Sequence, residues 1–199
     1  MKDVETIRPA EIAIAAILPR ADKADVLLGA GSLEAIPQGA RVGTSAPRRA
    51  AQLLNARPDL EVVGIRGNVA TRMAKLNAGE ADATFLAAAG LARLGENSVG
   101  TRLDPEEWLP APAQAAIGIE CRAEDDHARE ILAAIDHTPS NEEIMLERAL
   151  LEGLGGTCHS PIAALTTREG DQLHLQAAIY SPDGAIRIAQ ERLFDPHDL

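Results

Sequence analysis

Residues 41–95 read RVGTSAPRRAAQLLNARPDLEVVGIRGNVATRMAKLNAGEADATFLAAAGLARLG, and short apolar runs alternate there with segments of helical spacing. The runs at 41–44, 60–65 and 82–87 have the length and composition of buried strands. A strand followed by a helix, repeated in this way, is typical of a largely parallel α/β sheet. We therefore expect this stretch to form the centre of an α/β domain.

The helices between those strands carry start and stop signals. Ser45 is expected to cap the first helix, with Pro47 in its first turn, and Asn68 is expected to cap the second. Gly79 is expected to close the second helix, and a short third helix is expected over 89–94. Each helix would then begin just after a strand ends.

On the amino-terminal side, apolar runs at 12–18 and 24–28 predict two further strands. The connector 109–112, Leu-Pro-Ala-Pro, is stiff, and residues 115–121 beyond it return to strand character. The chain is therefore expected to cross between two sheets twice. This organisation gives two lobes like those of periplasmic binding proteins, of which the first is incomplete.

The carboxyl-terminal third predicts a small α+β domain. Helical spacing covers 124–135, and Ser140 with Glu143 forms a capping box for a helix that ends near Gly153. Beyond it the apolar residues alternate, as in one strand of a hairpin whose turn lies at 181–184: Leu173, Leu175, Ala177 and Ile179.

Composition limits the classes of function. The 199 residues include 46% hydrophobic but only 2% aromatic residues, and the formal net charge is -11. A chain this acidic is a poor general binder of nucleic acid or of anionic membranes. It has no apolar run of membrane-spanning length and no signal pattern at its start. We expect a cytoplasmic protein.

Cysteines, histidines and glycines exclude further classes. Cys121 and Cys158 are the only cysteines and are too isolated for a disulfide framework. The five histidines show no metal-ligand spacing, so no metal site is predicted. The glycines at 29–31 and 153–156 match no nucleotide-binding fingerprint.

The first turns of two predicted helices carry arginines. Arg48 and Arg49 lie where a helix already has partial positive charge, so they cost stability unless an anion binds there. Arg66 and Arg72 flank the next strand-helix junction, and the guanidinium fork suits carboxylates. The pattern predicts a carboxylate or phosphate site. The alternative is a set of solvated surface arginines.

Seven stretches in order resemble the signature blocks of the hydroxymethylbilane synthases, also called porphobilinogen deaminases. They are Met1–Val4, Val42–Ser45 with Arg48–Arg49, Arg66–Val69 with Thr71–Arg72, Leu86–Leu91, Leu109–Ala111, Gly118–Cys121 and Gly156–Ile162. The resemblance implies a transferase of porphyrin biosynthesis, which condenses four porphobilinogens, with loss of ammonia, into linear hydroxymethylbilane. It also implies a monomer whose partners are porphobilinogen and the growing oligopyrrole.

The resemblance also implies roles for particular residues. Cys158 would hold a covalent dipyrromethane cofactor through a thioether, whereas Cys121 is interpreted as a buried structural thiol. Asp3 would be the catalytic carboxylate, which stays ionised and stabilises positive charge in the transition state. The remaining cofactor-binding and substrate-binding positions would be Lys2, Thr44, Ser45, Arg48, Arg49, Arg66, Gly67, Arg72, Ala87, Gly90, Arg93 and Gln114.

The sequence also departs from the pattern of that family. It begins inside a signature block and stops soon after the predicted hairpin, which indicates truncation at both ends, whether from a misplaced start or from a deliberate fragment. Ala113 and Ala115 replace two glycines, and their methyl groups restrict the backbone between the lobes. We expect domains at 1–20 with 112–136, at 21–111 and at 137–199.

Two other functions remain open from sequence. Two α/β lobes with a double crossing also describe non-catalytic binders of anions and other solutes. An inactive fragment of the enzyme is the third alternative.

Overall fold

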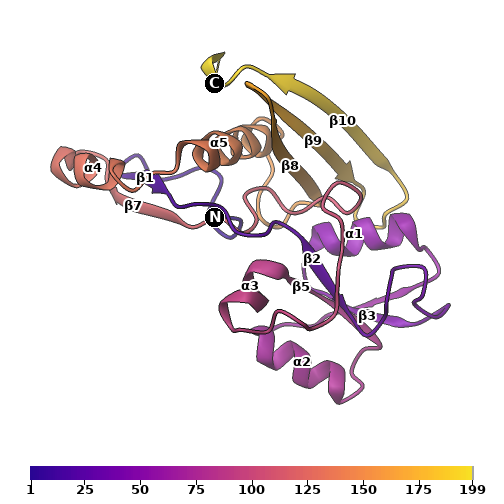
Figure 1. The fold of residues 1–199 in the computed structure, drawn as a ribbon. Helices are drawn as coiled ribbons and strands as arrows, with labels where there is room; N and C mark the ends of the chain where they lie inside the picture. Colours follow the sequence, from indigo (N-terminus) through magenta and orange to yellow (C-terminus); the bar gives the residue numbers. More distant parts are fainter. Residues whose placement is uncertain (199) are drawn as a thin grey trace.

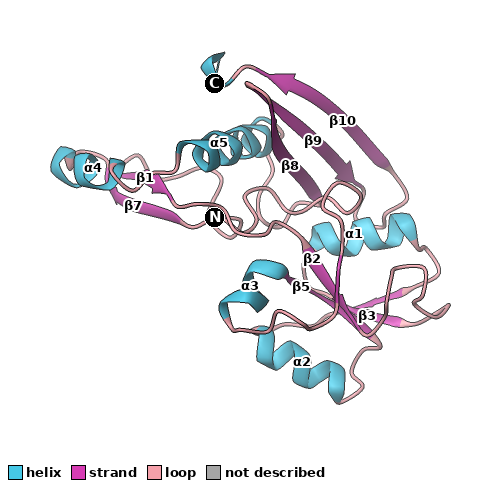
Figure 2. Cartoon of the chain, in the orientation of Figure 1, coloured by secondary structure: helices cyan, strands magenta, loops and turns pink. Residues whose placement is uncertain are grey.

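The computed structural model describes residues 1–198, which form three β-sheets and the helices that pack against them (Figure 1). Figure 2 shows that the helices lie in two groups, one around the central sheet and one beside the other two sheets. Among the described residues, none of the helices combines the length and the apolar character that a membrane crossing requires.

A two-stranded sheet joins distant parts of the chain. β1 (Ile12–Ile17) pairs antiparallel with β7 (Gly118–Arg122), and the register shifts between Ile14 and Ala16. α4 (Asp126–Ala133) follows β7 and begins at Asp125, whose carboxylate accepts from the backbone N–H of Ala128. The predicted return of the chain to its first sheet is confirmed.

The central sheet has five strands in the order β4-β3-β5-β2-β6, namely Glu61–Val63, Arg41–Gly43, Ala83–Ala87, Asp25–Leu28 and Thr101–Arg102. β3 runs parallel to β4 and β5, whereas β2 runs antiparallel to β5 and β6. Both pairings among the strands of residues 41–95 are therefore parallel, as predicted, and the two antiparallel pairings involve β2, which lies outside that stretch. Parallel neighbours need crossover connections, and β2 and β6 lie outside the strand-helix repeat that supplies them.

Three helices follow the parallel strands: α1 (Pro47–Ala56), α2 (Val69–Asn77) and α3 (Ala88–Arg93). Asn68 caps α2 as predicted, because its side chain accepts from the backbone N–H of Thr71 at 2.9 Å.

The predicted cap of α1 by Ser45 is wrong. Ala46 occupies the cap position without a side-chain bond, and the Ser45 hydroxyl donates to the Ile65 carbonyl at 3.0 Å. Pro47 forces the residue before it into extended backbone, so the cap position falls on Ala46.

The carboxyl-terminal part combines α5 (Thr138–Gly153) with an antiparallel sheet and ends in a short 3₁₀ helix. The sheet order is β10-β9-β8, namely Arg187–Phe194, Gln172–Tyr180 and Ile162–Glu169, and the final turn is η1 (Pro196–Asp198). The predicted hairpin is therefore confirmed, and β8 extends it.

The predicted capping box at Ser140 is wrong, because the cap of α5 lies three residues earlier, at His137. The His137 side chain caps it by accepting from the backbone N–H of Ser140, with proline in the first turn. Ser140 instead lies inside the helix, where its hydroxyl accepts from the backbone N–H of Arg20 at 2.9 Å.

The carboxyl-terminal sheet is buried on both faces near its centre, which corrects the expected single apolar face of β9. Leu173 and Leu175 pack toward Leu146 of α5, whereas Ala178 and Tyr180 pack with α1. α1 therefore lies between two sheets, as Figure 1 shows.

The chain crosses between the two-stranded sheet and the central sheet twice, once near Arg20 and once near Ala113. Glu147 of α5 links both of these crossing segments to the carboxyl-terminal sheet. It is fully buried and accepts from both Nη atoms of Arg20, at 2.8 and 2.9 Å. It also accepts from the backbone N–H groups of Ala113 at 2.7 Å and Thr166 at 2.8 Å. Every acceptor position of this carboxylate faces a donor from another part of the chain.

The second crossing contains two residues with left-handed backbone. Ala113 has φ 60° and Ala115 has φ 69°. A left-handed conformation costs a residue with a Cβ roughly 1–2 kcal/mol. The methyl groups therefore strain the segment that joins the lobes.

We expect Ala115→Gly to stabilise the protein by about 0.5–1 kcal/mol, because relief of this strain exceeds the entropy that glycine gains on unfolding. Urea unfolding would measure the change. Ala116 has no positive φ and is buried, so Ala116→Gly should destabilise the protein instead. A loss of stability in Ala115→Gly as large as that in Ala116→Gly would contradict this expectation.

Candidate functional site

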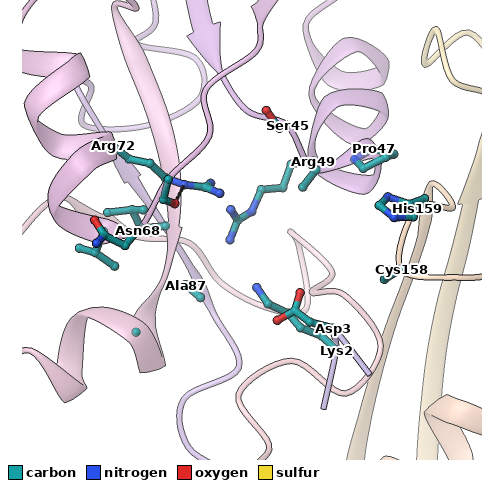
Figure 3. A pocket seen from close by; sticks show the side chains of 15 residues that line it. Lys2, Asp3, Ser45, Pro47, Arg49, Asn68, Arg72, Ala87, Cys158 and His159 are labelled. Carbon is teal, nitrogen blue, oxygen red and sulfur yellow. Dashed lines mark hydrogen bonds between the residues drawn. The ribbon is translucent and has the colours of Figure 1, made fainter. Parts of the chain in front are cut away.

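A cavity of about 380 Å³ lies between the central sheet, the amino-terminal segment and the loop after α5 (Figure 3). Nine of the residues expected at a binding site line it: Lys2, Asp3, Ser45, Arg49, Gly67, Arg72, Ala87, Gly90 and Cys158. Six further lining residues were not predicted, namely Ala46, Pro47, Asn68, Val69, Leu86 and His159.

Sheet topology explains why residues from three strand-helix junctions meet here. β3, β4 and β5 run in the same direction, so their carboxyl ends share one edge of the sheet. Arg49 follows β3, Arg72 follows β4, and Ala87 ends β5. Ligands of open α/β sheets bind at such an edge.

A single buried carboxylate explains why two adjacent arginines are tolerated at the start of α1. Asp25 of β2 is fully buried and accepts from Arg48 Nη1 at 2.7 Å. It also accepts from Arg49 Nη2 at 2.6 Å and from Arg49 Nε at 3.1 Å. The sequence indicated that an anion must oppose these arginines, and the chain itself supplies one.

Two neutral donors complete the shell of Asp25. The indole Nε1 of Trp108 donates to it at 3.0 Å, and Gln114 Nε2 donates at the same distance. Burial alone would raise the pKa of Asp25, but Arg48 and Arg49 together hold it well below its ordinary value. Asp25 is therefore ionised throughout the physiological pH range.

Among the side chains that the structure describes, no carboxylate lies within bonding distance of two cations of the cavity, Lys2 and Arg72. Desolvation, and next the charge of Arg49, lower the pKa of Lys2 to about 8, and its Nζ donates to Gln114 Oε1 at 3.5 Å. Desolvation and Arg49 also lower the pKa of Arg72, whose Nε donates to the Gly67 carbonyl at 2.8 Å. A bound anion would relieve the repulsion that both groups experience.

Asp3 lies beside Lys2 on the amino-terminal segment, and its side chain points toward Arg49 across the cavity, as Figure 3 shows. Its side chain is exposed, and it lines both the main cavity and a smaller one of about 80 Å³ beside it. No side chain among residues 1–198 forms a hydrogen bond with its carboxylate. Asp3 is thus the free negative group of a mainly positive cavity.

The thiol of Cys158 is exposed at the rim of the same cavity, in the loop between α5 and β8. The backbone N–H of Thr157 donates to the Ser160 hydroxyl at 2.9 Å, which turns the loop tightly. A side chain at Gly156 would lie 2.6 Å from Ile162 Cδ1, so glycine allows the loop to pack against the domain. These contacts hold the thiol in an accessible position.

The interpretation of Cys121 as a buried structural thiol is only partly right. Cys121 lies on β7, paired with Ala13, and is half-buried. The apolar sequence around Cys121 predicted full burial. A sheet of only two strands covers each strand incompletely, so the side chain stays partly exposed.

Five expected residues do not line the main cavity. Arg48, Thr44 and Gln114 are buried behind it, and Arg48 lines the smaller cavity that also reaches Cys158. Arg66 and Arg93 are exposed. Three of the four arginines that were expected to converge therefore do so, at two adjoining cavities, and Arg66 lies outside both.

Models of two protein domains match the chain. Residues 1–130 match the model described as "Porphobilinogen deaminase, dipyromethane cofactor binding domain". Residues 141–197 match "Porphobilinogen deaminase, C-terminal domain". The chain belongs to the porphobilinogen deaminase family. Family membership agrees with the site. The cations that line the cavity lie in the first matched segment, and Cys158 at its rim lies in the second.

Curated relatives named porphobilinogen deaminase cover almost the whole chain. The protein of Sphingopyxis alaskensis is 53% identical over 195 residues, which are 95% of this chain and 62% of the relative. That of Xanthomonas campestris pv. campestris is 48% identical over 194 residues, or 96% of this chain and 64% of the relative. The chain thus spans somewhat less than two thirds of the length of these porphobilinogen deaminases.

A search of solved structures found the second substrate binding domain of a putative amino acid ABC transporter from Streptococcus pneumoniae. The match covers 73% of this chain and 61% of that one, with 13% identity and a TM-score of 0.38. A similarity this low does not bear on the family assignment.

Proposed function

We propose that the chain acts as a hydroxymethylbilane synthase, which condenses four porphobilinogens into a linear tetrapyrrole and releases ammonia at each addition. The observation that carries this proposal is the exposed Cys158 thiol at the rim of a cavity lined by Lys2, Arg49 and Arg72. Porphobilinogen carries two carboxylates, and cations in a confined cavity suit such a ligand.

The donor set fits a dipyrromethane cofactor. Its acidic side chains need several cations within one cavity, and a thioether needs an accessible thiol beside them. When bound to Cys158, the cofactor supplies the terminal pyrrole to which new rings are added. The loop contacts of Thr157, Gly156 and Ser160 hold the Cys158 Sγ at that place.

In this proposal the cations bind and orient acetate and propionate groups. Arg49 and Arg72 have the planar fork that accepts a carboxylate bidentately, whereas Lys2 offers a point charge. The resemblance to the family also implies ligand contacts by five residues that do not line the main cavity. Of these, Arg48, Thr44 and Gln114 would act from behind it and Arg66 and Arg93 from its surroundings.

Asp3 is the proposed catalytic carboxylate. It has no partner among the described side chains, so it can accept hydrogen bonds from pyrrole N–H groups. Its negative charge opposes the positive charge that develops on the substrate as ammonia leaves.

We also propose that the three sheets mark three domains, at 1–20 with 112–136, at 21–111 and at 137–199. Porphobilinogen and the growing oligopyrrole would be the partners of a cytoplasmic monomer. The net charge of -11 supports the exclusion of nucleic acid and of anionic membranes.

Ammonia release during incubation with porphobilinogen tests the proposed activity. We expect one ammonia for each porphobilinogen consumed, and none with Cys158→Ser. Cys121→Ser provides the matched control and should retain activity. Binding without ammonia release would instead indicate an anion-binding module, and neither binding nor release would indicate an inactive fragment.

The pKa of Lys2 makes porphobilinogen binding pH-dependent. Lys2 attracts carboxylates when protonated, and it loses its proton as the pH rises through about 8. A hydrogen bond to a charged donor is worth about 1 kcal/mol more than one to a neutral donor, so affinity should fall about fivefold between pH 7 and pH 9.5. Isothermal titration calorimetry across this range would measure the fall.

Lys2→Arg is the control for this titration, because arginine keeps its charge throughout. Any loss of affinity that the variant shares with the wild type reports titration of the ligand itself. Identical pH profiles for the two proteins would exclude Lys2 as the titrating group.

A further inference from the structure

We propose that Asp25 is a positioning residue, which fixes the guanidinium of Arg49 so that its outward N–H groups face the carboxylates of the ligand. This inference rests on the proposed function, because it concerns the same cavity. Asp25 itself lines neither the main cavity nor the smaller one beside it.

The surroundings of Asp25 leave it no capacity to bind a ligand directly. Five donor contacts reach its two oxygens, at distances from 2.6 to 3.1 Å, and its exposed fraction is 0%. A carboxylate offers about four lone-pair sites, so these donors saturate it. Apart from the long-range effect of its charge, any influence of Asp25 on the ligand must therefore pass through the groups that it holds.

Arg49 is held in a single orientation. Its Nε and Nη2 donate to Asp25 in a two-point contact, and its Nη1 donates to the Phe85 carbonyl at 3.1 Å. These contacts use three of the five N–H groups of the guanidinium. Figure 3 shows the head of Arg49 in the cavity, where the other two N–H groups can meet a carboxylate.

Asp25 also orders a second cation through Gln114. The Gln114 amide donates to Asp25 and to the Lys23 carbonyl, which fixes the direction of its oxygen. That oxygen accepts from Lys2 Nζ at 3.5 Å. One buried carboxylate thereby organises a cation from α1 and a cation from the amino-terminal segment.

Charge and position predict opposite effects when Asp25 is neutralised. Without its negative charge the cavity becomes more positive, so electrostatic attraction alone predicts tighter binding of a carboxylate ligand. Loss of the two-point contact lets Arg49 rotate, and ordering it again on binding lowers affinity. The sign of the change therefore separates a positioning role from a purely electrostatic one.

The test compares Asp25→Asn with Asp22→Asn by isothermal titration calorimetry with porphobilinogen. Asp22 is a matched control, because it is partly exposed, pairs with Arg102 at 2.7 Å and lines neither of these two cavities. We expect Asp25→Asn to bind at least tenfold more weakly and Asp22→Asn to bind within twofold of wild type. Unchanged or tighter binding by folded Asp25→Asn overturns the proposal.

A milder variant keeps the test decisive if Asp25→Asn does not fold. Trp108→Phe removes one donor to Asp25 and leaves all charges in place. The rings of Trp108 and Phe85 are stacked with their centroids 5.1 Å apart, and a phenylalanine ring at position 108 can keep this contact. We expect binding about two- to fivefold weaker. Wild-type affinity in this variant would then overturn the proposal.

A ligand-free readout separates this inference from the proposed function. If the wild-type chain does not bind porphobilinogen, the proposed function fails, but the Nε–H proton of Arg49 still reports its order. By nuclear magnetic resonance that proton should exchange slowly with water in wild type and in Asp22→Asn, and at least tenfold faster in Asp25→Asn or Trp108→Phe. Equal exchange rates would refute the positioning role, and Arg49→Lys assigns the signal.

Discussion

Asp3→Asn is expected to lower kcat for ammonia release by about 10²–10³-fold, with a much smaller change in KM. The reason is that the carboxylate opposes a positive charge that forms only in the transition state, and loss of one such preorganised group has effects of this size. Asparagine has nearly the same shape and can still accept a hydrogen bond, so the substitution removes mainly the charge. Steady-state kinetics with porphobilinogen would measure both constants.

Glu5→Gln is the control for Asp3→Asn. Glu5 is another exposed carboxylate of the amino-terminal segment, but it lines a different cavity, of about 510 Å³, which also reaches Cys158. Its replacement should change kcat less than twofold. If the Asp3 variant loses affinity while kcat is retained, then Asp3 binds substrate and does not stabilise the transition state.

Glu147→Ala is expected to destabilise the protein by about 3–5 kcal/mol, which is a large part of the stability of an ordinary domain. The change leaves the buried guanidinium of Arg20 without its two-point partner and two backbone N–H groups without acceptors. Urea unfolding followed by circular dichroism would measure the loss.

Glu130→Ala on α4 is the matched control, because Glu130 is exposed, and it should change stability by less than about 0.5 kcal/mol. A double variant separates the ion pair from packing: Arg20→Met with Glu147→Leu replaces the two charges by apolar groups. It should be more stable than Glu147→Ala alone. Equal stability of Glu147→Ala and wild type would show that this buried contact does not hold the crossing segments.

Local chemistry made much of the fold predictable. The helix over Val69–Asn77 begins at Asn68 because its side chain reaches the next turn, which is a contact within four residues. The predicted cap of α1 was wrong because Pro47 restricts the backbone of the residue before it, which places Ala46 at the cap position. This restriction outweighs the preference of Ser45 for a cap position. The two-sided burial of β9 could not be predicted, since it depends on how α1 and α5 dock from elsewhere in the chain.

The candidate site was predictable where its residues stand in recognisable local patterns. Arg49, Arg72 and Cys158 lie in such patterns, and the structure brings them to one cavity. Asp25 was missed because its partners are at least 23 residues away in sequence. An acid inside the apolar run 24–28 was the available signal, since a buried charge needs a partner.

His159 was also missed, because only the geometry of the loop turns it toward the main cavity beside Cys158. No local sequence pattern distinguishes it from the other histidines. Its place shows that the rim of the cavity depends on loop geometry as well as on the strand-helix junctions.

The central claim is that cations from separate strand-helix junctions and the Cys158 thiol serve one groove. Intact mass after incubation with porphobilinogen, followed by peptide mapping, tests it most directly. We predict an added mass equal to two porphobilinogens less two ammonia molecules, located on Cys158, and its absence in Arg49→Ala. A chain that folds but keeps a bare Cys158, or that carries the adduct on Cys121, would contradict the account.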